Sequence, residues 1–361
     1  KGKAYSENLW NKRVAAKRMT EAERDAKLTL IKPTTDFADL AGCDIVVEAV
    51  FEDRAIKADV TRKAEAVIAP GAIFASNTSP LPISGLAEAS ARPANFIGLH
   101  FFSPVDKMPL VEIIRGQATS DECLARAMDF VKAILKTPIV VNDSRGFYTS
   151  RVFSTYVGEG LALLAEGVKP ALIDNAGRMA GMPVGPLALA DEVSLELMAR
   201  IRKQTAADLG KAYQRSAIDD VCDRMVDKLG RLGKKTGKGF YDYPQDGQKQ
   251  LWAGLAQAFP LAATQPTVEE VKQRLMFIQS VETARCLEEI VLLAPIDADV
   301  GAILGWGFPA YLGGPIGQIH SLGLAAFVKA CETLAERHGA RFAPPQLLRR
   351  MADQGERFYD L

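Results

Sequence analysis

The sequence lacks an excess of charge of either sign, since 44 lysines and arginines balance 44 aspartates and glutamates. Nucleic acids and anionic membranes attract basic proteins, so this balance argues against nucleic acid as a partner. Long apolar runs are also missing, and the apolar stretch at 290–294 is far too short for a transmembrane segment. We therefore expect no nucleic-acid partner and no transmembrane segment.

Cysteine is scarce, and the five thiols lie far apart with no CxxC pair among them. An odd, scattered set supplies neither a disulfide framework nor a zinc site, and it is typical of a reducing compartment. We therefore expect no metal. A composition that is 48% hydrophobic and 24% charged is instead that of a folded globular protein. A chain of 361 residues has room for two or three domains.

Short apolar stretches alternate with helical patterns in the first part of the chain. We expect strands at 44–50, 72–76, 96–102, 110–114 and 138–141, and helices at 54–68, 82–89 and 122–135. Continuous apolar strands that alternate with helices predict a mostly parallel sheet with both faces covered. The first domain should therefore be an α/β domain that extends to residue 142.

The opening residues lack a glycine-rich phosphate-binding turn. Gly2 stands alone there, and residue 1 is lysine. In a dinucleotide-binding domain, the phosphate cradle and the ribose-binding acid would therefore precede Lys1. Residues 1–30 are charged and compatible with helix, so we expect the chain to start inside a domain. The Gly-Lys run at 233–239 has neither the spacing nor the preceding strand of a phosphate loop.

Helical periodicity dominates beyond residue 149, and part of it repeats. The repeat pairs Arg151 with Arg274, Glu159 with Glu282, Asp174 with Asp297 and, after a small insertion, Pro186 with Pro315. These ordered matches favour a duplicated helical module, although chance similarity between helical hairpins is an alternative. We expect one helical domain at 143–244, a linker at 245–267 and a second copy at 268–361.

Polar side chains follow the predicted strands at their carboxyl ends, where doubly wound sheets bind ligands. Glu52 follows the first strand, Ser79 the second and Ser103 the third. His100, one of three histidines, lies in the third strand and is a natural general base near neutral pH. A return strand would bring Glu112 beside it to orient the imidazole. The alternatives are a packed core histidine and a solvated glutamate.

Six ordered motifs span most of the chain. They read DIVVEAVFEDRAIK (44–57), ASNTS (75–79), GLHFFSPVDKMPLVEII (98–114), DSRGFYTSR (143–151), GMPVGPLALADEVSL (181–195) and KKTGKGFYDY (234–243). Together they resemble the L-3-hydroxyacyl-CoA dehydrogenases. The later motif GWGFPAYLGGP (305–315) is similar to the duplicated C-terminal domain of multifunctional β-oxidation proteins. The resemblance implies a Rossmann-type NAD-binding domain without its first βαβ unit, followed by two tandem all-α dehydrogenase domains.

The resemblance also implies a function and a set of site residues. The reaction would be NAD-dependent oxidation of L-3-hydroxyacyl-CoA to 3-ketoacyl-CoA. His100 matches the catalytic base of the family, Glu112 the residue that orients it, and Ser79 a residue that contacts the substrate. Ser150 stands where the family commonly has asparagine, so its contact with the substrate oxygen is an open question.

For the cofactor, the resemblance implies that Glu52 and Lys57 contact NAD, with Ser79 and Ser103 near the nicotinamide. A solvated helix face is the alternative for Lys57, and a helix N-cap is the alternative for Ser79. The implied partners are an acyl-CoA substrate, an upstream enoyl-CoA hydratase domain and a possible thiolase, with the bacterial cytoplasm as the expected location. Three alternatives stay open: a free-standing 3-hydroxybutyryl-CoA dehydrogenase, a non-catalytic structural relative, and a fragment unable to bind NAD.

Overall fold

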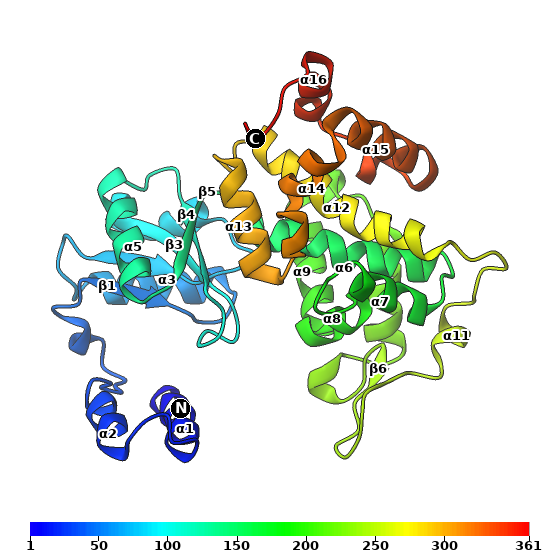
Figure 1. Cartoon of the computed structure of the whole chain (residues 1–361). Helices are drawn as coiled ribbons and strands as arrows, with labels where there is room; N and C mark the ends of the chain where they lie inside the picture. The colour runs from blue at the N-terminus through cyan, green and yellow to red at the C-terminus, as the bar shows by residue number, and fades with distance from the viewer. Residues whose placement is uncertain (361) are drawn as a thin grey trace.

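The computed structural model describes residues 1–360, in which an α/β part precedes a larger helical part (Figure 1). The α/β part contains one sheet in the order β1-β2-β3-β4-β5. Its strands are β1 (Ile45–Glu48), β2 (Ile73–Ser76), β3 (Phe96–Phe101), β4 (Leu110–Arg115) and β5 (Thr137–Asn142). All neighbouring pairs are parallel except β3 and β4. The predicted mostly parallel sheet is therefore confirmed.

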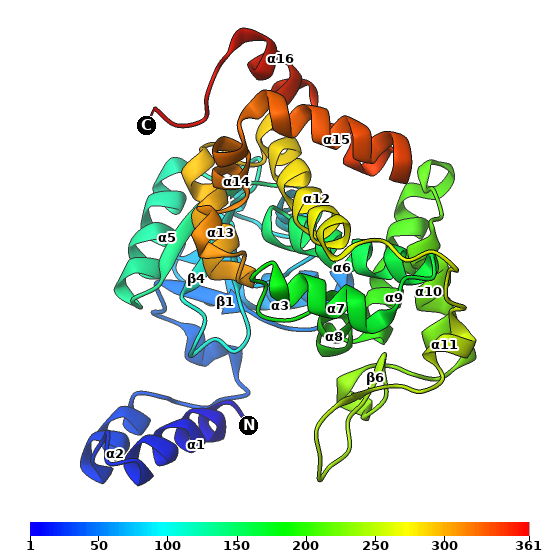
Figure 2. The same cartoon turned by 45° about the vertical axis from the view of Figure 1, so that its right-hand side comes forward.

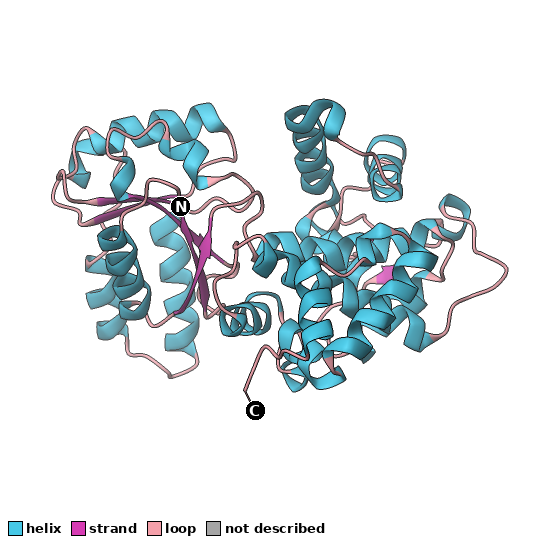
Figure 3. Cartoon of the chain, turned by 90° about the horizontal axis from the view of Figure 1, so that it is seen from above, coloured by secondary structure: helices cyan, strands magenta, loops and turns pink. Residues whose placement is uncertain are grey.

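Helices cover both faces of this sheet (Figure 3). They are α3 (Arg54–Glu65), α4 (Ile83–Ala87) and α5 (Asp121–Ala133). Alternate strand residues point to opposite faces. Ile97 and Leu99 of β3 pack in a core with α5, whereas Phe96 belongs to the larger core that continues into the helical part. Side chains on both faces are therefore buried, which explains the continuous apolar runs in the sequence.

Two helices at the amino-terminal end, α1 (Gly2–Ala15) and α2 (Glu21–Thr29), form a hairpin that stands apart from the sheet (Figures 1 and 2). Neither helix contains a buried residue. Strand β1 lies at the edge of the sheet, and its residues 45–47 are only half-buried, whereas every residue of β2 is buried. The outer edge of β1 is thus an exposed parallel edge with apolar side chains.

The helical part begins after β5 with α6 (Thr149–Ala165), α7 (Pro170–Met179) and α8 (Pro186–Val193). It continues with α9 (Leu195–Leu209), α10 (Ala217–Asp223), β6 (Tyr241–Asp242), β7 (Gln250–Leu251) and α11 (Leu255–Ala258). The last elements are α12 (Val268–Glu288), α13 (Pro295–Trp306), α14 (Pro315–Leu322), α15 (Leu324–His338) and α16 (Gln346–Gln354).

The sequence repeat appears in the structure as an exchange of ion pairs between α6 and α12. Arg151 of α6 binds Glu282 of α12 with a distance of 2.6 Å from Nε to Oε1. Arg274 of α12 binds Glu159 of α6 with a distance of 2.6 Å from its guanidinium to Oε1. Each arginine therefore contacts the glutamate of the other copy, as an approximate two-fold arrangement requires. Helices α6, α7 and α8 correspond to α12, α13 and α14.

The structure corrects one pairing within this repeat. Asp174 accepts hydrogen bonds from the backbone N–H groups that open α8, and Asp299 does the same at the start of α14. Asp299, and not Asp297, is therefore the counterpart of Asp174. The sequence comparison was wrong by two residues because the turn at 289–294 before α13 is longer than the turn at 166–169 before α7.

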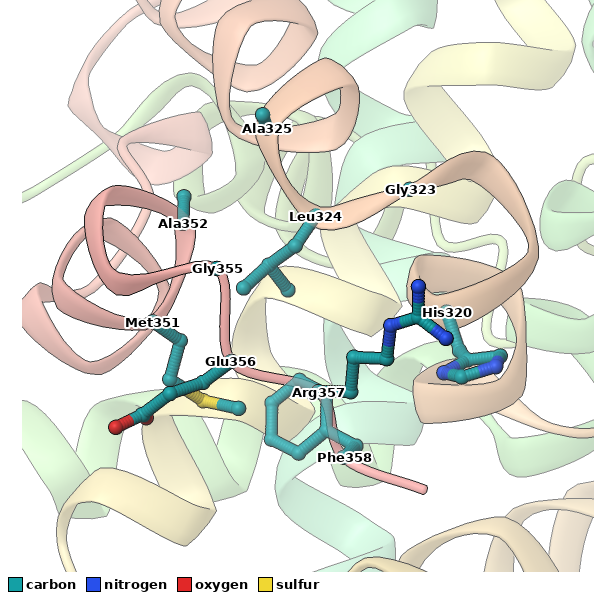
Figure 4. A pocket seen from close by; sticks show the side chains of 10 residues that line it. All are labelled: His320, Gly323, Leu324, Ala325, Met351, Ala352, Gly355, Glu356, Arg357 and Phe358. Carbon is teal, nitrogen blue, oxygen red and sulfur yellow. The ribbon is translucent and has the colours of Figure 1, made fainter. Parts of the chain in front are cut away.

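The two copies differ in the segment that precedes their matching Phe-Tyr-Asp triplets. In the first copy, residues 229–239 lead to Phe240, and Gly233 packs against the backbone at the start of α9. In the second copy, only residues 355–357 lead from α16 to Phe358. A pocket of about 390 Å³ opens there, and Arg357 extends toward His320 (Figure 4). The shorter connection therefore leaves a space that the first copy fills.

Asp191 on α8 anchors the triplet of the first copy. Its carboxylate accepts hydrogen bonds from the backbone N–H groups of Phe240 (2.8 Å) and Tyr241 (2.9 Å) and from the hydroxyl of Tyr243 (3.0 Å). Burial opposes the charged carboxylate more strongly than these donors favour it, and it raises the pKa of Asp191 to about 6. Asp191 is therefore protonated more readily in the folded chain than in the unfolded chain.

This raised pKa predicts a loss of stability as the pH rises. Between the ordinary value of 3.8 and about 6, the folded state binds the proton of Asp191 more tightly than the unfolded state. The free energy of unfolding should fall across this window by up to about 3 kcal/mol through this group. Urea unfolding at several pH values measures the slope. Removal of the negative contribution of Asp191 should make the slope less negative in Asp191→Asn and leave it unchanged in Asp246→Asn, which alters an exposed carboxylate; equal slopes in all three proteins would contradict the assignment.

Candidate active site

His100 and Glu112 are direct neighbours in the sheet. Strands β3 and β4 run antiparallel, and the register places His100 opposite Glu112. The imidazole Nδ1 lies 2.9 Å from Glu112 Oε2, and both side chains are buried. A carboxylate can only accept, so Nδ1–H donates the hydrogen bond and Nε2 of the neutral ring carries the free lone pair. The pair thus has the geometry of a base and the group that orients it.

Glu112 also joins the sheet to the helical part. Its Oε1 accepts hydrogen bonds from the backbone N–H groups of Tyr148 (2.9 Å) and Thr149 (3.0 Å), where α6 begins. Tyr148 provides no side-chain cap there. The free N–H groups of a helix start favour a negative charge, so this contact stabilises the buried carboxylate. No sequence pattern points to either residue, because both contribute backbone N–H groups at a helix start, although Thr149 adds its hydroxyl.

Ser79 lies on the open side of His100. Its Oγ is 3.2 Å from Nε2, and its backbone N–H donates to Glu52 Oε1 at 3.2 Å. Helix α4 begins only at Ile83, whose N–H donates to Asp143. Ser79 is therefore not a helix cap, and its hydroxyl lies within hydrogen-bonding distance of Nε2.

Lys57 is buried in an ion-pair cluster at the end of β1. Its Nζ lies 2.9 Å from Glu48 Oε1 and 3.5 Å from Glu52 Oε2, and its side chain is only 2% exposed. A buried ammonium is stable only when it is paired in this way. Glu52 also accepts a hydrogen bond from Thr78 Oγ1 at 2.7 Å. Lys57 thus holds Glu52 in place, while Glu52 is the partly exposed member. Sequence reasoning missed Glu48, which lies inside an apolar strand.

The structure does not bring Ser103 and Ser150 into contact with the base. Ser103 is exposed in the loop after β3, next to a cis bond to Pro104. Ser150 is partly buried in the first turn of α6. Within residues 1–360, neither hydroxyl forms a hydrogen bond with His100 or Glu112. Both residues lie on segments that flank the site, and their roles remain predictions.

The residues present fit one end of NAD. Glu52 lies beside Ser79 and offers a partly exposed carboxylate. This carboxylate can accept hydrogen bonds from ribose hydroxyls. Helix α3 follows β1 without a glycine-rich turn, and its N-terminus is capped by Asp53 through the Ile56 N–H. This helix start would repel phosphate. The polar groups of Glu52 and Ser79 are therefore chemically suited to the nicotinamide-ribose end of NAD, whereas the start of α3 is not suited to its pyrophosphate.

A Rossmann-like sheet with a His–Glu pair near the carboxyl ends of its strands, followed by a helical domain, is an architecture typical of dinucleotide-dependent dehydrogenases. The chain belongs to the 3-hydroxyacyl-CoA dehydrogenase family. Residues 1–144 match the NAD binding domain of 3-hydroxyacyl-CoA dehydrogenase, and residues 146–243 match its C-terminal domain. NAD is the cofactor of this domain, and the predicted helical domain after the sheet is confirmed.

Individual relatives show the same relationship. The chain is 42% identical over 99% of its length to the fatty acid oxidation complex subunit alpha of Shewanella halifaxensis, of which it spans 50%. A 3-hydroxybutyryl-CoA dehydrogenase from Ralstonia eutropha is 35% identical, with a TM-score of 0.61 over 66% of this chain and 84% of that one. The dehydrogenase part of multifunctional enzyme 1 from C. elegans is 26% identical, with a TM-score of 0.65 over 95% and 80%.

Residues 1–360 contain neither a candidate membrane-spanning helix nor a candidate metal-binding cluster. None of the helices there is both long enough and apolar enough to cross a membrane. In the same residues, histidine, cysteine and carboxylate side chains nowhere gather in a group of three that could hold a metal ion.

Proposed function

We propose that the chain catalyses the NAD-dependent oxidation of L-3-hydroxyacyl-CoA to 3-ketoacyl-CoA. The observation that carries this proposal is the position of His100, whose Nδ1 contacts Glu112 at 2.9 Å while its Nε2 faces Ser79 at 3.2 Å. A base oriented from one side and open on the other suits proton removal from a hydroxyl group. Membership in the 3-hydroxyacyl-CoA dehydrogenase family supports the substrate class.

The chain's own residues would act as follows. His100 Nε2 takes the proton of the 3-hydroxyl group, and Glu112 stabilises the resulting imidazolium. Ser79 donates a hydrogen bond to the oxygen that becomes the ketone, and Glu52 would accept hydrogen bonds from the ribose hydroxyls of NAD. The chemistry that the bound cofactor would supply is acceptance of the hydride released from C3. The burial of His100 and Glu112 keeps water away from the pair and strengthens their interaction.

The test is NADH oxidation with acetoacetyl-CoA by the full-length protein and by its His100→Gln variant. Loss of a general acid–base residue should lower turnover by about 10²–10⁴-fold. His320→Gln is the matched control, because His320 lies on α14 outside the site, and it should retain the parent rate. Unchanged turnover in His100→Gln would remove His100 from the mechanism. A folded parent without turnover would overturn the proposed function.

A second candidate is a preference for short acyl groups. The E. coli 3-hydroxybutyryl-CoA dehydrogenase has the same fold over 98% of this chain, with a TM-score of 0.81 at 24% identity. The duplicated helical part is therefore compatible with a free-standing short-chain enzyme. A series of 3-ketoacyl-CoA substrates distinguishes the two candidates. A kcat/KM that falls steeply beyond four carbons favours the short-chain enzyme, and a flat or rising series favours β-oxidation of longer chains.

The wider context is also a proposal. The curated relatives are about twice as long as this chain, which spans 50% of the S. halifaxensis protein. Their name, fatty acid oxidation complex subunit alpha, supports a bifunctional β-oxidation protein with an enoyl-CoA hydratase domain upstream of the dehydrogenase. A thiolase partner and the bacterial cytoplasm agree with that context. Co-purification of a thiolase with the full-length protein tests the partner.

A further inference from the structure

The Glu112 carboxylate has a second side-chain donor besides His100. Thr149 Oγ1 lies 2.5 Å from Glu112 Oε2, the same oxygen that His100 Nδ1 contacts at 2.9 Å. Both oxygens of Glu112 therefore have two donors each, because the N–H groups of Tyr148 and Thr149 share Oε1. Four donors are about the number that a carboxylate can accept. The orientation of the carboxylate plane is fixed by this set.

The position of Thr149 explains why its hydroxyl is free for this contact. Threonine inside a helix commonly donates its hydroxyl to a carbonyl of the preceding turn. In this chain Thr155, Thr205 and Thr283 do so, each to a carbonyl of its own helix. Thr149 is the first residue of α6, so no helical carbonyl precedes it. Its hydroxyl donates instead to Glu112, and the residue is only 1% exposed.

We infer that Thr149 is a positioning residue for the His100–Glu112 pair. It is the only side chain of the helical part, within residues 1–360, that donates to Glu112. The hydroxyl holds Oε2 in the plane that His100 Nδ1 requires, so the imidazole keeps one tautomer and directs Nε2 toward the substrate. The base is thus oriented from two domains at once: His100 and Glu112 come from the sheet, and Thr149 comes from the helical domain.

This inference rests on the proposed function, and the test separates the two. The variant Thr149→Val keeps the shape of the side chain and removes the hydroxyl, whereas Thr149→Ser keeps the hydroxyl. We expect kcat with acetoacetyl-CoA to fall on the order of tenfold in the valine variant, as for loss of a hydrogen bond to a charged group. KM should change less than twofold, and the serine variant should recover most of kcat. Thr155→Val is the control on the same helix.

A readout without turnover comes from the imidazole nitrogens. The chain has three histidines, so spectra of protein labelled with ¹⁵N-histidine can be assigned with His320→Gln and His338→Gln. The parent should show His100 as a single tautomer with a slowly exchanging Nδ1 proton, and Thr149→Val should speed that exchange at least tenfold. An inactive parent would overturn the proposed function. An active parent with unchanged kcat and unchanged exchange in the valine variant would overturn the inference on Thr149 alone.

Discussion

Glu112→Gln should be nearly inactive although it conserves the size of the side chain. The amide oxygen of the glutamine can still accept hydrogen bonds from the two backbone N–H groups that open α6. In that orientation its NH₂ group faces His100 Nδ1. Two donors would then meet, so the imidazole must expose the Nδ1 lone pair and place its proton on Nε2. The ring could no longer take a proton through Nε2. The equivalent carboxylate-to-amide change in a serine-protease triad costs about 10⁴-fold in kcat.

We therefore expect kcat to fall by about 10³-fold or more in Glu112→Gln, with little change in KM. Steady-state rates with acetoacetyl-CoA and NADH measure both constants. Glu122→Gln, which alters an exposed carboxylate at the start of α5, should behave as the parent. The imidazole spectrum should show the opposite tautomer at His100. A variant that keeps more than a tenth of the parent kcat would show that Glu112 serves the fold and not the base.

The sequence predicted much of the sheet and part of the site, for physical reasons that also explain its failures. The strands carry continuous apolar runs because both faces are buried. The order of these strands then places Glu52, Ser79 and His100 together at the carboxyl ends of β1, β2 and β3. The pairing of His100 with Glu112 could be anticipated from a strand that returns after a proline-rich turn, and the register agrees.

Contacts that depend on backbone groups or on distant elements could not be predicted in this way. Tyr148 and Thr149 contact Glu112 because α6 starts where β4 passes, and no local pattern encodes that meeting. Glu48 lies within an apolar strand, and its carboxylate is the partner of Lys57, a contact that no local pattern encodes. Helix α8 was not expected, since it is short and begins at Pro186 within a motif rich in glycine and proline. Its start is fixed by Asp174, twelve or more residues earlier in the chain.

The exchanged ion pairs of the two helical copies give the second large effect. Arg274 is 1% exposed and binds Glu159, which is 2% exposed, as well as Glu166. Arg274→Met would leave the buried Glu159 with Arg341 as its remaining cationic partner. Removal of one member of a buried pair costs about 3–5 kcal/mol when the other charge is left alone, and because Arg341 stays paired with Glu159 we expect a loss near the lower end of this range. Urea unfolding should show a loss of this size.

The other copy supplies the matched control. Arg151 occupies the equivalent position in α6, but its side chain is 19% exposed and one of its partners, Glu289, is 50% exposed. Water can replace the lost contact there, so Arg151→Met should cost only about 1 kcal/mol. Adding Glu159→Met to Arg274→Met removes the stranded carboxylate and should restore at least half of the lost stability. Equal losses in the two single variants would contradict this reasoning. Such a result would mean that the position in the repeat, and not the burial of the pair, determines how much unfolding free energy is lost when its arginine is replaced.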